Sequence, residues 1–510
     1  MTPPKRFYLT TPLYYVNAKP HLGHAYTSVV ADCIARWHRQ QGEEVFLLTG
    51  TDEHGEKIAQ AAQAQGISPK DFTDKTSETF RTLWEKLGVS YDYFIRTTDP
   101  AHQQVVQQVL EKLLPQLEKG KYTFWYCIPC ETSYGLPEID PAKPVCPTCQ
   151  RPVSQVEEED YFLPLEKHRA WLKDQIQEDK IFLRPPSRRN EVLAMLDKEL
   201  PDLCVTRPKE RVTWGIPVPF SPNHVTYVWF DALLNYISAL GWPAGEKFHA
   251  LWEQTGAVHL IGKDIIRHHA LYWPIILHAL GINPPKTIFA HGWWLVKGEK
   301  MSKSKGNIVE PEAVVEAYGL DAFRYFLLRD VLLGDDGVFS EQALIQRINA
   351  DLANDLGNLV YRTLTMIEKH AGGQVPTGQL DRPFAEGIST TQTSVRAVMS
   401  SWKPSLALNS LWELINRANR SVEEAAPWTL AKEGKRAELE QFLYQMAESL
   451  RVIALFLWPF LPTTAQSIWQ QLGFDTALEK QRLPDALQHP IPSGQAVRKG
   501  KPLFPRLETT

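Results

Sequence analysis

The sequence predicts an α/β domain with a parallel sheet, split by a cysteine-bearing insertion and followed by an all-α domain. Three observations predict this arrangement. Short apolar runs alternate with helical periodicity in two separated stretches, residues 1–114 and 225–295. Residues 115–224 carry turns, prolines and a cysteine cluster, and from about residue 345 the patterns are amphipathic and helical. A chain of 510 residues has room for about three domains, so such a division is expected.

The first stretch opens with a strand–helix–strand unit. Phe7–Thr10 and Val45–Thr49 are short apolar runs of the buried-strand kind. Ala25–Gln41 between them has helical periodicity, and Gly42 stands where that helix would end. Strands joined by a helix pair in parallel through a right-handed crossover, so we expect a parallel sheet.

Strand signals return after the insertion, at VTYVWF (225–230), AVHLIG (257–262) and TIFAHGWWLV (287–296). They indicate that the sheet resumes there. Beyond about residue 345 no clear strand pattern remains, and the polar segment 371–383 is expected to be a loop between helices.

Composition is that of an ordinary globular protein, with 43% hydrophobic and 22% charged residues. The net charge of −4 gives no sign of nucleic-acid binding, although it allows a local basic face. The longest apolar run, residues 452–462, is too short to span a bilayer, and the N-terminal segment lacks the apolar core of a signal peptide. We therefore expect a cytoplasmic protein that does not enter a membrane.

Four cysteines form two closely spaced pairs, Cys127 with Cys130 and Cys146 with Cys149, fifteen residues apart. Each C-x2-C lets two sulfurs of one tight turn reach the same ion, and two such knuckles complete a tetrahedron. The alternative is four unrelated thiols. The spacing favours one closed structural zinc site that stabilises an insertion with little core of its own.

His21-Leu-Gly-His24 lies at the predicted start of the first helix. The two rings are three residues apart, so both leave one face of a first turn whose N–H groups and dipole favour an anion. Gly23 removes a side chain that would block close approach. Neither Gly-x-x-x-x-Gly-Lys-Ser/Thr nor Gly-x-Gly-x-x-Gly occurs here, which excludes the usual phosphate-loop and dinucleotide motifs. The histidine pair alone leaves function open.

A second unusual stretch, KGEKMSKSKGN at 297–307, holds four lysines. It is either a solvated surface loop or a cationic flap that closes on phosphates. Lys300 and Lys303 are three residues apart in a Gly/Ser segment, so both ammonium groups can reach one polyphosphate.

The histidine motif together with Lys300-Met-Ser-Lys-Ser resembles the paired signature of class I aminoacyl-tRNA synthetases. A closer resemblance, to the bacterial type of methionyl-tRNA synthetase, covers nearly the whole chain and is carried by TTPLYYVNAKPHLGHAYT, LTGTDEHGEKI, the knuckle insertion, RVTWGIPVP, TYVWFDALLNYISAL, HLIGKDIIRHHALYWP and NADLANDLGNLVYRT.

This resemblance implies a Rossmann-like catalytic domain and a helical anticodon-binding domain. The expected divisions are a first catalytic half (1–114), a connective insertion with the zinc knuckle (115–224), a second catalytic half (225–295), the lysine-rich loop with a linking domain (296–345), the anticodon-binding domain (346–478) and a C-terminal tail (479–510).

The resemblance also implies residue roles. The expected catalytic residues are His21, His24, Lys300 and Lys303. ATP is expected to contact His21, Gly23, His24, Gly262, Asp264 and Lys303. Asp264 would also suit helix N-capping, an alternative that stays open. The attack of a methionine carboxylate on the α-phosphorus needs mainly positioning and cations, which these side chains would supply.

The implied methionine pocket is aromatic and apolar, because the thioether is uncharged and favours aromatic surfaces. Its expected lining is Leu13, Tyr15, Asp52, Trp229, Ala232, Leu233, Tyr236, His269 and Tyr272. Asp52 would hold the substrate ammonium, and His269 would close the end of the pocket. Taken singly, any of these aromatic residues would more often be a core residue than a ligand contact.

In the helical part, Asn354, Asn358 and Arg362 form one polar stripe at four-residue spacing. Such a stripe is usually a solvated helix face. By resemblance, Asn358, Arg362 and Trp428 would bind splayed anticodon bases by hydrogen bonding and stacking.

The expected activity is ligation of L-methionine to tRNA(Met), including the initiator, at the expense of ATP with Mg2+. A monomer is expected, because family members that dimerise use an appended C-terminal module. Two alternatives remain open. One is another class I synthetase, for valine, leucine, isoleucine or cysteine, and the other is a zinc-containing RNA-binding protein without catalysis.

Overall fold

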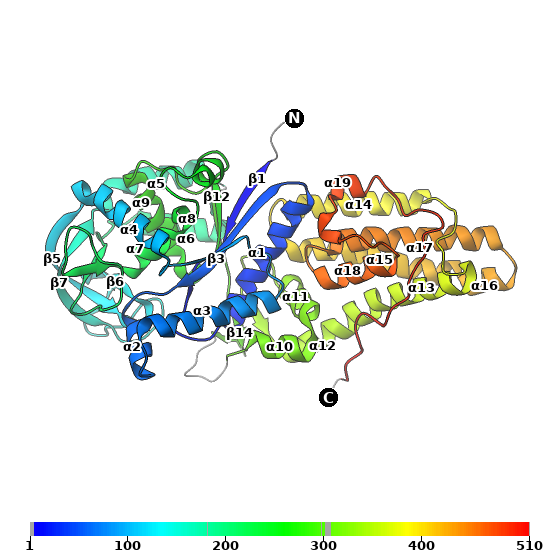
Figure 1. Cartoon of the computed structure of the whole chain (residues 1–510), viewed down its shortest axis with the longest axis horizontal. Helices are drawn as coiled ribbons and strands as arrows, with labels where there is room; N and C mark the ends of the chain where they lie inside the picture. Colours follow the sequence, from blue (N-terminus) through cyan, green and yellow to red (C-terminus); the bar gives the residue numbers. More distant parts are fainter. Residues whose placement is uncertain (1–4, 181, 297, 301–307, 509–510) are drawn as a thin grey trace. The chain divides into compact units, whose positions relative to one another are not determined.

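The computed structural model describes residues 5–180, 182–296, 298–300 and 308–508 (Figure 1). They form two compact units. The sheet unit comprises Arg6–Thr27 and Phe46–Gly292, and the helical unit contains Ser28–Val45 and the chain from Trp293 onward. The domain boundaries given above stay a prediction.

The sheet unit is built on seven strands in the order β2-β3-β1-β12-β13-β8, with β4 paired to β3. Their bounds are β1 Arg6–Thr10, β2 Tyr14–Tyr15, β3 Glu44–Asp52, β4 Tyr93–Arg96, β8 Leu183–Arg184, β12 Ala257–Gly262 and β13 Thr287–His291. β12 pairs in parallel with β1 and β13, and β3 pairs in parallel with β2 and β4. The predicted parallel sheet is confirmed. Carboxyl ends of parallel strands meet at one edge, which is where α/β proteins bind ligands.

The first crossover also matches the prediction. α1 (Leu22–Gln40) follows β1 and ends before Gly42, whose φ of +88° is the left-handed conformation that glycine adopts most easily. The other helices of the sheet unit are α2 Glu56–Ala64, α3 Pro69–Lys86, α4 Pro100–Leu113, α5 Glu166–Glu178, α6 Pro186–Leu196, α7 Val228–Leu233, α8 Asn235–Ser238 and α9 Trp273–Ala279.

One strand signal was wrong in part. Only the start of VTYVWF is extended: β11 (His224–Thr226) pairs antiparallel with β10 (Thr206–Pro208), away from the main sheet, and Val228 begins helix α7. A short, fully apolar run has the same sequence pattern in a buried helix as in a buried strand. Neither element has a polar face whose residue spacing would distinguish the two.

The cysteine-bearing insertion forms its own four-stranded antiparallel sheet in the order β6-β5-β7-β9. Its strands are β5 Glu118–Cys127, β6 Thr132–Tyr134, β7 Ser154–Leu163 and β9 Leu203–Cys204. The core at its tip is small, with Tyr134, Ile139 and Val153 packed around the cysteines. This agrees with an insertion that has little apolar core of its own.

The helical unit is helical as predicted, with a small sheet of β14 (Trp294–Val296), β15 (Glu299–Lys300) and β16 (Gly337–Phe339). Its helices are α10 Pro311–Tyr318, α11 Leu320–Arg329, α12 Glu341–Arg347, a π-helix Ile348–Gly357, α13 Asn358–Ala371, α14 Arg382–Met399, α15 Pro404–Ala425, α16 Pro427–Lys432, α17 Arg436–Leu457, α18 Pro462–Gln471 and α19 Leu483–Ala486. The predicted loop at 371–383 is the connection between α13 and α14. Among the described residues, no helix has both the length and the apolarity that crossing a membrane requires.

Candidate active site and metal centre

His21 and His24 stand at the N-terminal end of α1, as predicted, with their ring centroids 3.8 Å apart. The backbone N–H of Gly23 donates to Nδ1 of His21 (3.1 Å), and the backbone N–H of His21 donates to Nδ1 of His24 (3.2 Å). A ring nitrogen that accepts a hydrogen bond carries no proton, so both rings hold theirs on Nε2. Burial, with the neighbouring His21, lowers the pKa of His24 well below its usual value. The pair therefore presents N–H donors on a helix start.

Two glycines at this edge have side chains packed closely against them. A Cβ on Gly23 would lie 3.0 Å from the His21 ring, closer than side chains normally approach. A Cβ on Gly262, at the end of β12, would lie 2.6 Å from Oδ1 of Asp264. Both positions therefore admit only glycine without rearrangement.

Contacts bring these predicted residues to one edge of the sheet. The hydroxyl of Thr27, in the next turn of α1, lies 2.8 Å from Nε2 of His291 at the end of β13. His291 is the register partner of Gly262. The histidine pair, Gly262 and Asp264 thus lie near the carboxyl ends of β12 and β13.

Asp52 ends β3, and Tyr15 on β2 is its register partner. Its carboxylate is buried, and Oδ1 has no hydrogen-bond partner among the described residues. Burial, with the charges of Asp231 and Glu131, raises the pKa of Asp52 well above its usual value. A buried carboxylate oxygen without a donor is costly, so this position favours a cationic ligand.

Tyr236 and His269 are bonded to each other inside the sheet unit. Nδ1 of His269 lies 3.0 Å from the carbonyl oxygen of Ile265, which can only accept, so Nδ1 is the donor. Nε2 of His269 therefore accepts from the Tyr236 hydroxyl at 2.8 Å. Burial lowers the pKa of His269 to about 4, which makes the ring neutral at pH 7. The pair offers a polarisable but uncharged surface.

The other predicted pocket residues belong to the same apolar core. Trp229 stacks on His268 with 3.8 Å between centroids, and His268 meets the Tyr272 ring edge to face at 5.3 Å. Leu13, Tyr15 and Trp229 are partly buried against a cluster that includes Leu233, Tyr236 and Tyr272. Ala232 is buried beside Leu233 on α7.

A buried aspartate bonded to two histidines connects α7 with the segment after β3. The Asp231 carboxylate lies 2.7 Å from Nδ1 of His54 and 2.7 Å from Nε2 of His102. Burial alone would raise the pKa of Asp231, but the two histidines more than offset it and hold that pKa below its usual value. These three residues were not predicted from the sequence, although His54 lies in LTGTDEHGEKI and Asp231 in TYVWFDALLNYISAL.

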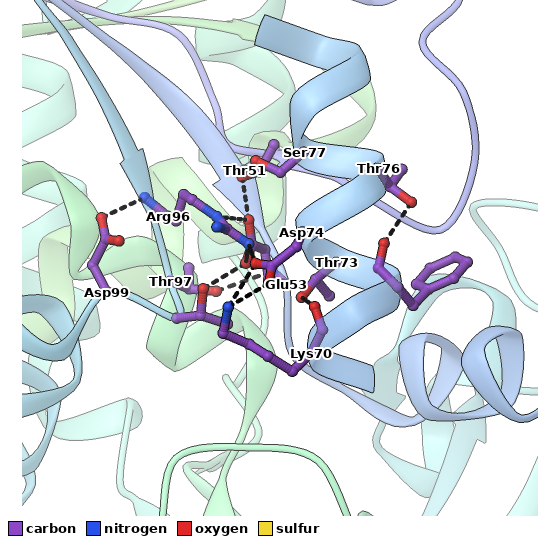
Figure 2. A network of polar contacts seen from close by, with 12 residues as sticks. Thr51, Glu53, Lys70, Thr73, Asp74, Thr76, Ser77, Arg96, Thr97 and Asp99 are labelled. Carbon is purple, nitrogen blue, oxygen red and sulfur yellow. Dashed lines mark hydrogen bonds and ion pairs between the residues drawn. The ribbon is translucent and has the colours of Figure 1, made fainter. Parts of the chain in front are cut away.

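A second network fixes the end of β3 from the other side (Figure 2). Glu53, which follows Asp52, accepts hydrogen bonds from Nε and Nη2 of Arg96, each at 2.7 Å. Nη2 of Arg96 also donates to the Asp74 carboxylate on α3 at 2.6 Å. The hydroxyls of Thr51 and Thr98 donate to the Glu53 carboxylate, each at 2.6 Å. Both oxygens of Glu53 are bonded, whereas Oδ1 of Asp52 beside it has no hydrogen-bond partner among the described residues and is left for a ligand.

The four predicted cysteines come together. Their sulfur atoms all lie within 4.8 Å of one another, with Cys127 to Cys149 at 3.6 Å and Cys130 to Cys146 at 3.8 Å. A tetrahedron with metal–sulfur bonds of about 2.3 Å has edges of about 3.8 Å, so the spacing fits one tetrahedral ion. Hydrogen bonding with Cys130 lowers the pKa of Cys127 to about 5, which favours a thiolate.

In the helical unit, Asn358 and Arg362 lie on α13 and Trp428 lies on α16. An ion pair of 2.8 Å joins Arg362 to Glu423, near the end of α15. Ala426 follows in the left-handed conformation (φ 41°) and turns the chain into α16, whose second residue is Trp428. The Trp428 side chain is 52% exposed, which a packing role would not explain.

Residues 7–364 match the family described as tRNA synthetases class I (M). The chain is 46% identical to the methionine–tRNA ligase of Caldanaerobacter subterraneus subsp. tengcongensis, over 99% of this chain and 79% of that protein. It is 42% identical to the methionine–tRNA ligase of Thermotoga maritima, over 99% of this chain and 80% of that protein. A solved structure of Mycobacterium tuberculosis methionyl-tRNA synthetase in complex with methionyl-adenylate is 38% identical, with a TM-score of 0.93 over 98% of this chain and all of that one. The chain belongs to the methionine–tRNA ligase family of class I synthetases.

Two lysines of the signature, Lys300 and Lys303, have side chains outside the described part of this methionine–tRNA ligase family member. Lys303 lies outside the described residues. The backbone of Lys300 forms the last residue of β15, but its side chain lies outside the described part of the chain. Their expected roles stay predictions.

Proposed function

We propose that this chain is an ATP-dependent methionine–tRNA ligase. It converts L-methionine and ATP to methionyl-adenylate and pyrophosphate, then transfers methionine to the 3′-terminal adenosine of tRNA(Met). The observation that carries the proposal is the unpartnered oxygen of buried Asp52, beside Tyr15 and at the same sheet edge as the histidine pair. An α-amino acid presents an ammonium group for such a carboxylate and a carboxylate for attack on phosphorus.

In the activation step, the Nε2–H groups of His21 and His24 donate to ATP phosphate oxygens at the start of α1. Lys300 and Lys303 add positive charge to the pyrophosphate, where negative charge grows as the bond to the α-phosphorus breaks. The methionine carboxylate is already an anion, so no general base is needed. Gly23 and Gly262 leave room for the nucleotide, Asp264 holds its adenosine, and Mg2+ arrives with ATP.

Methionine selection rests on shape and polarisability. Asp52 holds the ammonium, while Leu13, Tyr15 and residues of α7, of α8 and of the π-helix His268–Tyr272 enclose the thioether. Trp229, Ala232, Leu233, Tyr236, His269 and Tyr272 form this enclosure. A neutral His269 adds no charge near sulfur. Norleucine and homocysteine should be rejected imperfectly, because such small differences are worth about 1–3 kcal/mol.

The four cysteines would hold one structural zinc ion, which supplies a cross-link between the two knuckles of the insertion. With four sulfur ligands no coordination position is left for a substrate. This distinguishes the site from one that binds a cysteine substrate through its metal.

The helical unit would read the anticodon through Asn358, Arg362 and Trp428. An exposed indole can stack on an unpaired base, and the amide and guanidinium can bond base edges. A monomer that acts in the cytoplasm is consistent with this function and stays a prediction.

Amino-acid-dependent ATP–pyrophosphate exchange tests the proposal. Methionine should support exchange far better than valine, leucine, isoleucine or cysteine. Preference for any of those four would overturn it in favour of another class I synthetase. No exchange with methionine or with any of the four would favour an RNA-binding protein without catalysis.

A further inference from the structure

The first cysteine knuckle ends in a strained residue. Glu131 follows Cys130, is 4% exposed, and has the left-handed backbone conformation (φ 48°, ψ 41°). Residues with a Cβ avoid this conformation, and they persist in it where the surrounding contacts demand it. The contacts of Glu131 therefore need an explanation.

Its carboxylate connects two segments that are far away in sequence. Oε1 accepts from the Tyr15 hydroxyl at 2.8 Å and from the backbone N–H of Lys57 at 3.1 Å. Lys57 is in the first turn of α2, and the N-cap residue of this helix, Gly55, has no side chain to cap it. Glu131 thus acts as the N-terminal cap of α2 from 74 residues away, and the same oxygen orients Tyr15.

Backbone carbonyl groups of the same turn accept hydrogen bonds from a second part of the predicted methionine pocket, around the start of α7. The Tyr227 hydroxyl donates to the Glu131 carbonyl at 2.6 Å, and Nε1 of Trp229 donates to the Cys130 carbonyl at 3.3 Å. Nζ of Lys57 donates to the Pro129 carbonyl. Every residue from Pro129 to Glu131 therefore bonds to a segment that borders the pocket.

The segment that follows β3 leaves space for this turn because it has a glycine, Gly55, at the point of contact. A Cβ on Gly55 would lie 2.7 Å from Oε2 of Glu131 and 2.9 Å from the Tyr15 hydroxyl. The φ of Gly55, +108°, also requires glycine. Because Gly55 comes three residues after Asp52, the position of Glu131 bears on Asp52 as well as on Tyr15.

We propose that Glu131 is a positioning residue for methionine binding, which couples the folded four-cysteine site to Tyr15, Trp229 and the segment after Asp52. The zinc knuckle then has a role beyond holding the insertion together: it sets the geometry of the amino-acid pocket. This inference rests on the function proposed above.

The second knuckle provides a matched control. Gln150 follows Cys149 as Glu131 follows Cys130, and it too is left-handed (φ 60°). It is exposed, and its side chain donates within its own turn, to the Pro147 carbonyl at 3.1 Å, rather than to a distant segment of the described chain. Glycine relieves backbone strain at both positions, so neither Glu131→Gly nor Gln150→Gly should unfold the knuckles.

The experiment compares the parent with Glu131→Gly, Glu131→Gln and Gln150→Gly in methionine-dependent pyrophosphate exchange, with zinc content measured on the same preparations. Glu131→Gly should raise the KM for methionine about 10-fold or more, since a hydrogen bond to a charged group is lost. The KM for ATP and the zinc content should not change. Glu131→Gln keeps an accepting oxygen and should stay within about 3-fold of the parent, as should Gln150→Gly.

Tyr15→Phe removes the donor of the same hydrogen bond, so its effect and that of Glu131→Gly should be less than additive. The inference is overturned if Glu131→Gly matches Gln150→Gly, if Glu131→Gln is as impaired as Glu131→Gly, or if the KM rises only together with zinc loss. An inactive parent would instead overturn the proposed function, and the inference with it.

Discussion

The predicted methionine pocket and the predicted anticodon site are built in opposite ways. Asp52, Tyr236 and His269 are 6%, 1% and 2% exposed and are fixed by neighbours on several elements. Trp428 is 52% exposed, and the Arg362 side chain is 39% exposed and pairs with the exposed carboxylate of Glu423. The first site is enclosed by the fold before any ligand arrives, while the second leaves its side chains available to a large partner.

This difference reflects what each site must recognise. A small amino acid offers few atoms, so discrimination requires buried groups that lose a partner when the wrong ligand binds. Unpaired bases offer flat surfaces and edges, and exposed aromatic and amide side chains suffice to hold them. Substitutions should therefore be costly in the pocket and modest in the helical unit, and each should affect one half-reaction.

The largest effect should come from Asp52→Asn. Loss of a buried charge partner costs about 3–5 kcal/mol, so kcat/KM for methionine should fall by about 10³-fold. Since the pKa of Asp52 is raised, kcat/KM of the parent should also fall as the pH drops through that pKa, because a protonated carboxyl no longer holds an ammonium. The variant should lack this acid limb.

Asp197→Asn is the control for Asp52→Asn, because that carboxylate is exposed and pairs only with Lys173 at 2.8 Å. Steady-state exchange kinetics from pH 5 to 9 make the measurement. A normal KM in Asp52→Asn would mean that the buried carboxylate is structural.

Lys303→Ala should separate binding from chemistry. Removing one electrostatic stabiliser of the transition state should slow single-turnover adenylate formation by about 10²-fold. Methionine affinity, measured by equilibrium binding, should barely change, because the predicted pocket contains no residue of this stretch. Lys305→Ala, outside the signature, is the control, and a rate within a few-fold of the parent for Lys303→Ala would make the lysine-rich stretch a solvated loop.

Trp428→Ala should have a smaller effect, confined to the second substrate. Loss of one stacked base is worth about 1–3 kcal/mol, so kcat/KM for tRNA should fall by about 10-fold or more while exchange stays intact. Leu332→Ala, another exposed apolar residue of the helical unit, should change neither. Equal loss in aminoacylation and in exchange would show that Trp428 acts through packing.

Some residues of these sites could be predicted from the sequence, and others could not. Asp52 was found through the resemblance of its motif to the family, and the cysteines were found because their spacing is local. Glu131 and the His54–Asp231–His102 group were missed because their partners are 74 to 177 residues away. Only folding reveals that the residue after a knuckle caps a distant helix, or that a carboxylate within an apolar run joins two histidines.

The smallest effect should come from the ion pair between Arg362 and Glu423. Both side chains are largely exposed, and such pairs add little stability, so Glu423→Gln should change the free energy of unfolding by less than about 0.5 kcal/mol. An anticodon must compete with Glu423 for the guanidinium, and the carboxylate also repels its phosphates. Glu423→Gln should therefore lower the KM for tRNA, by about 2–5-fold at low salt and less at high salt. Arg362→Ala should raise that KM instead. A higher KM in Glu423→Gln would show that the carboxylate positions Arg362 for the tRNA, which would make the helical site preorganised like the pocket.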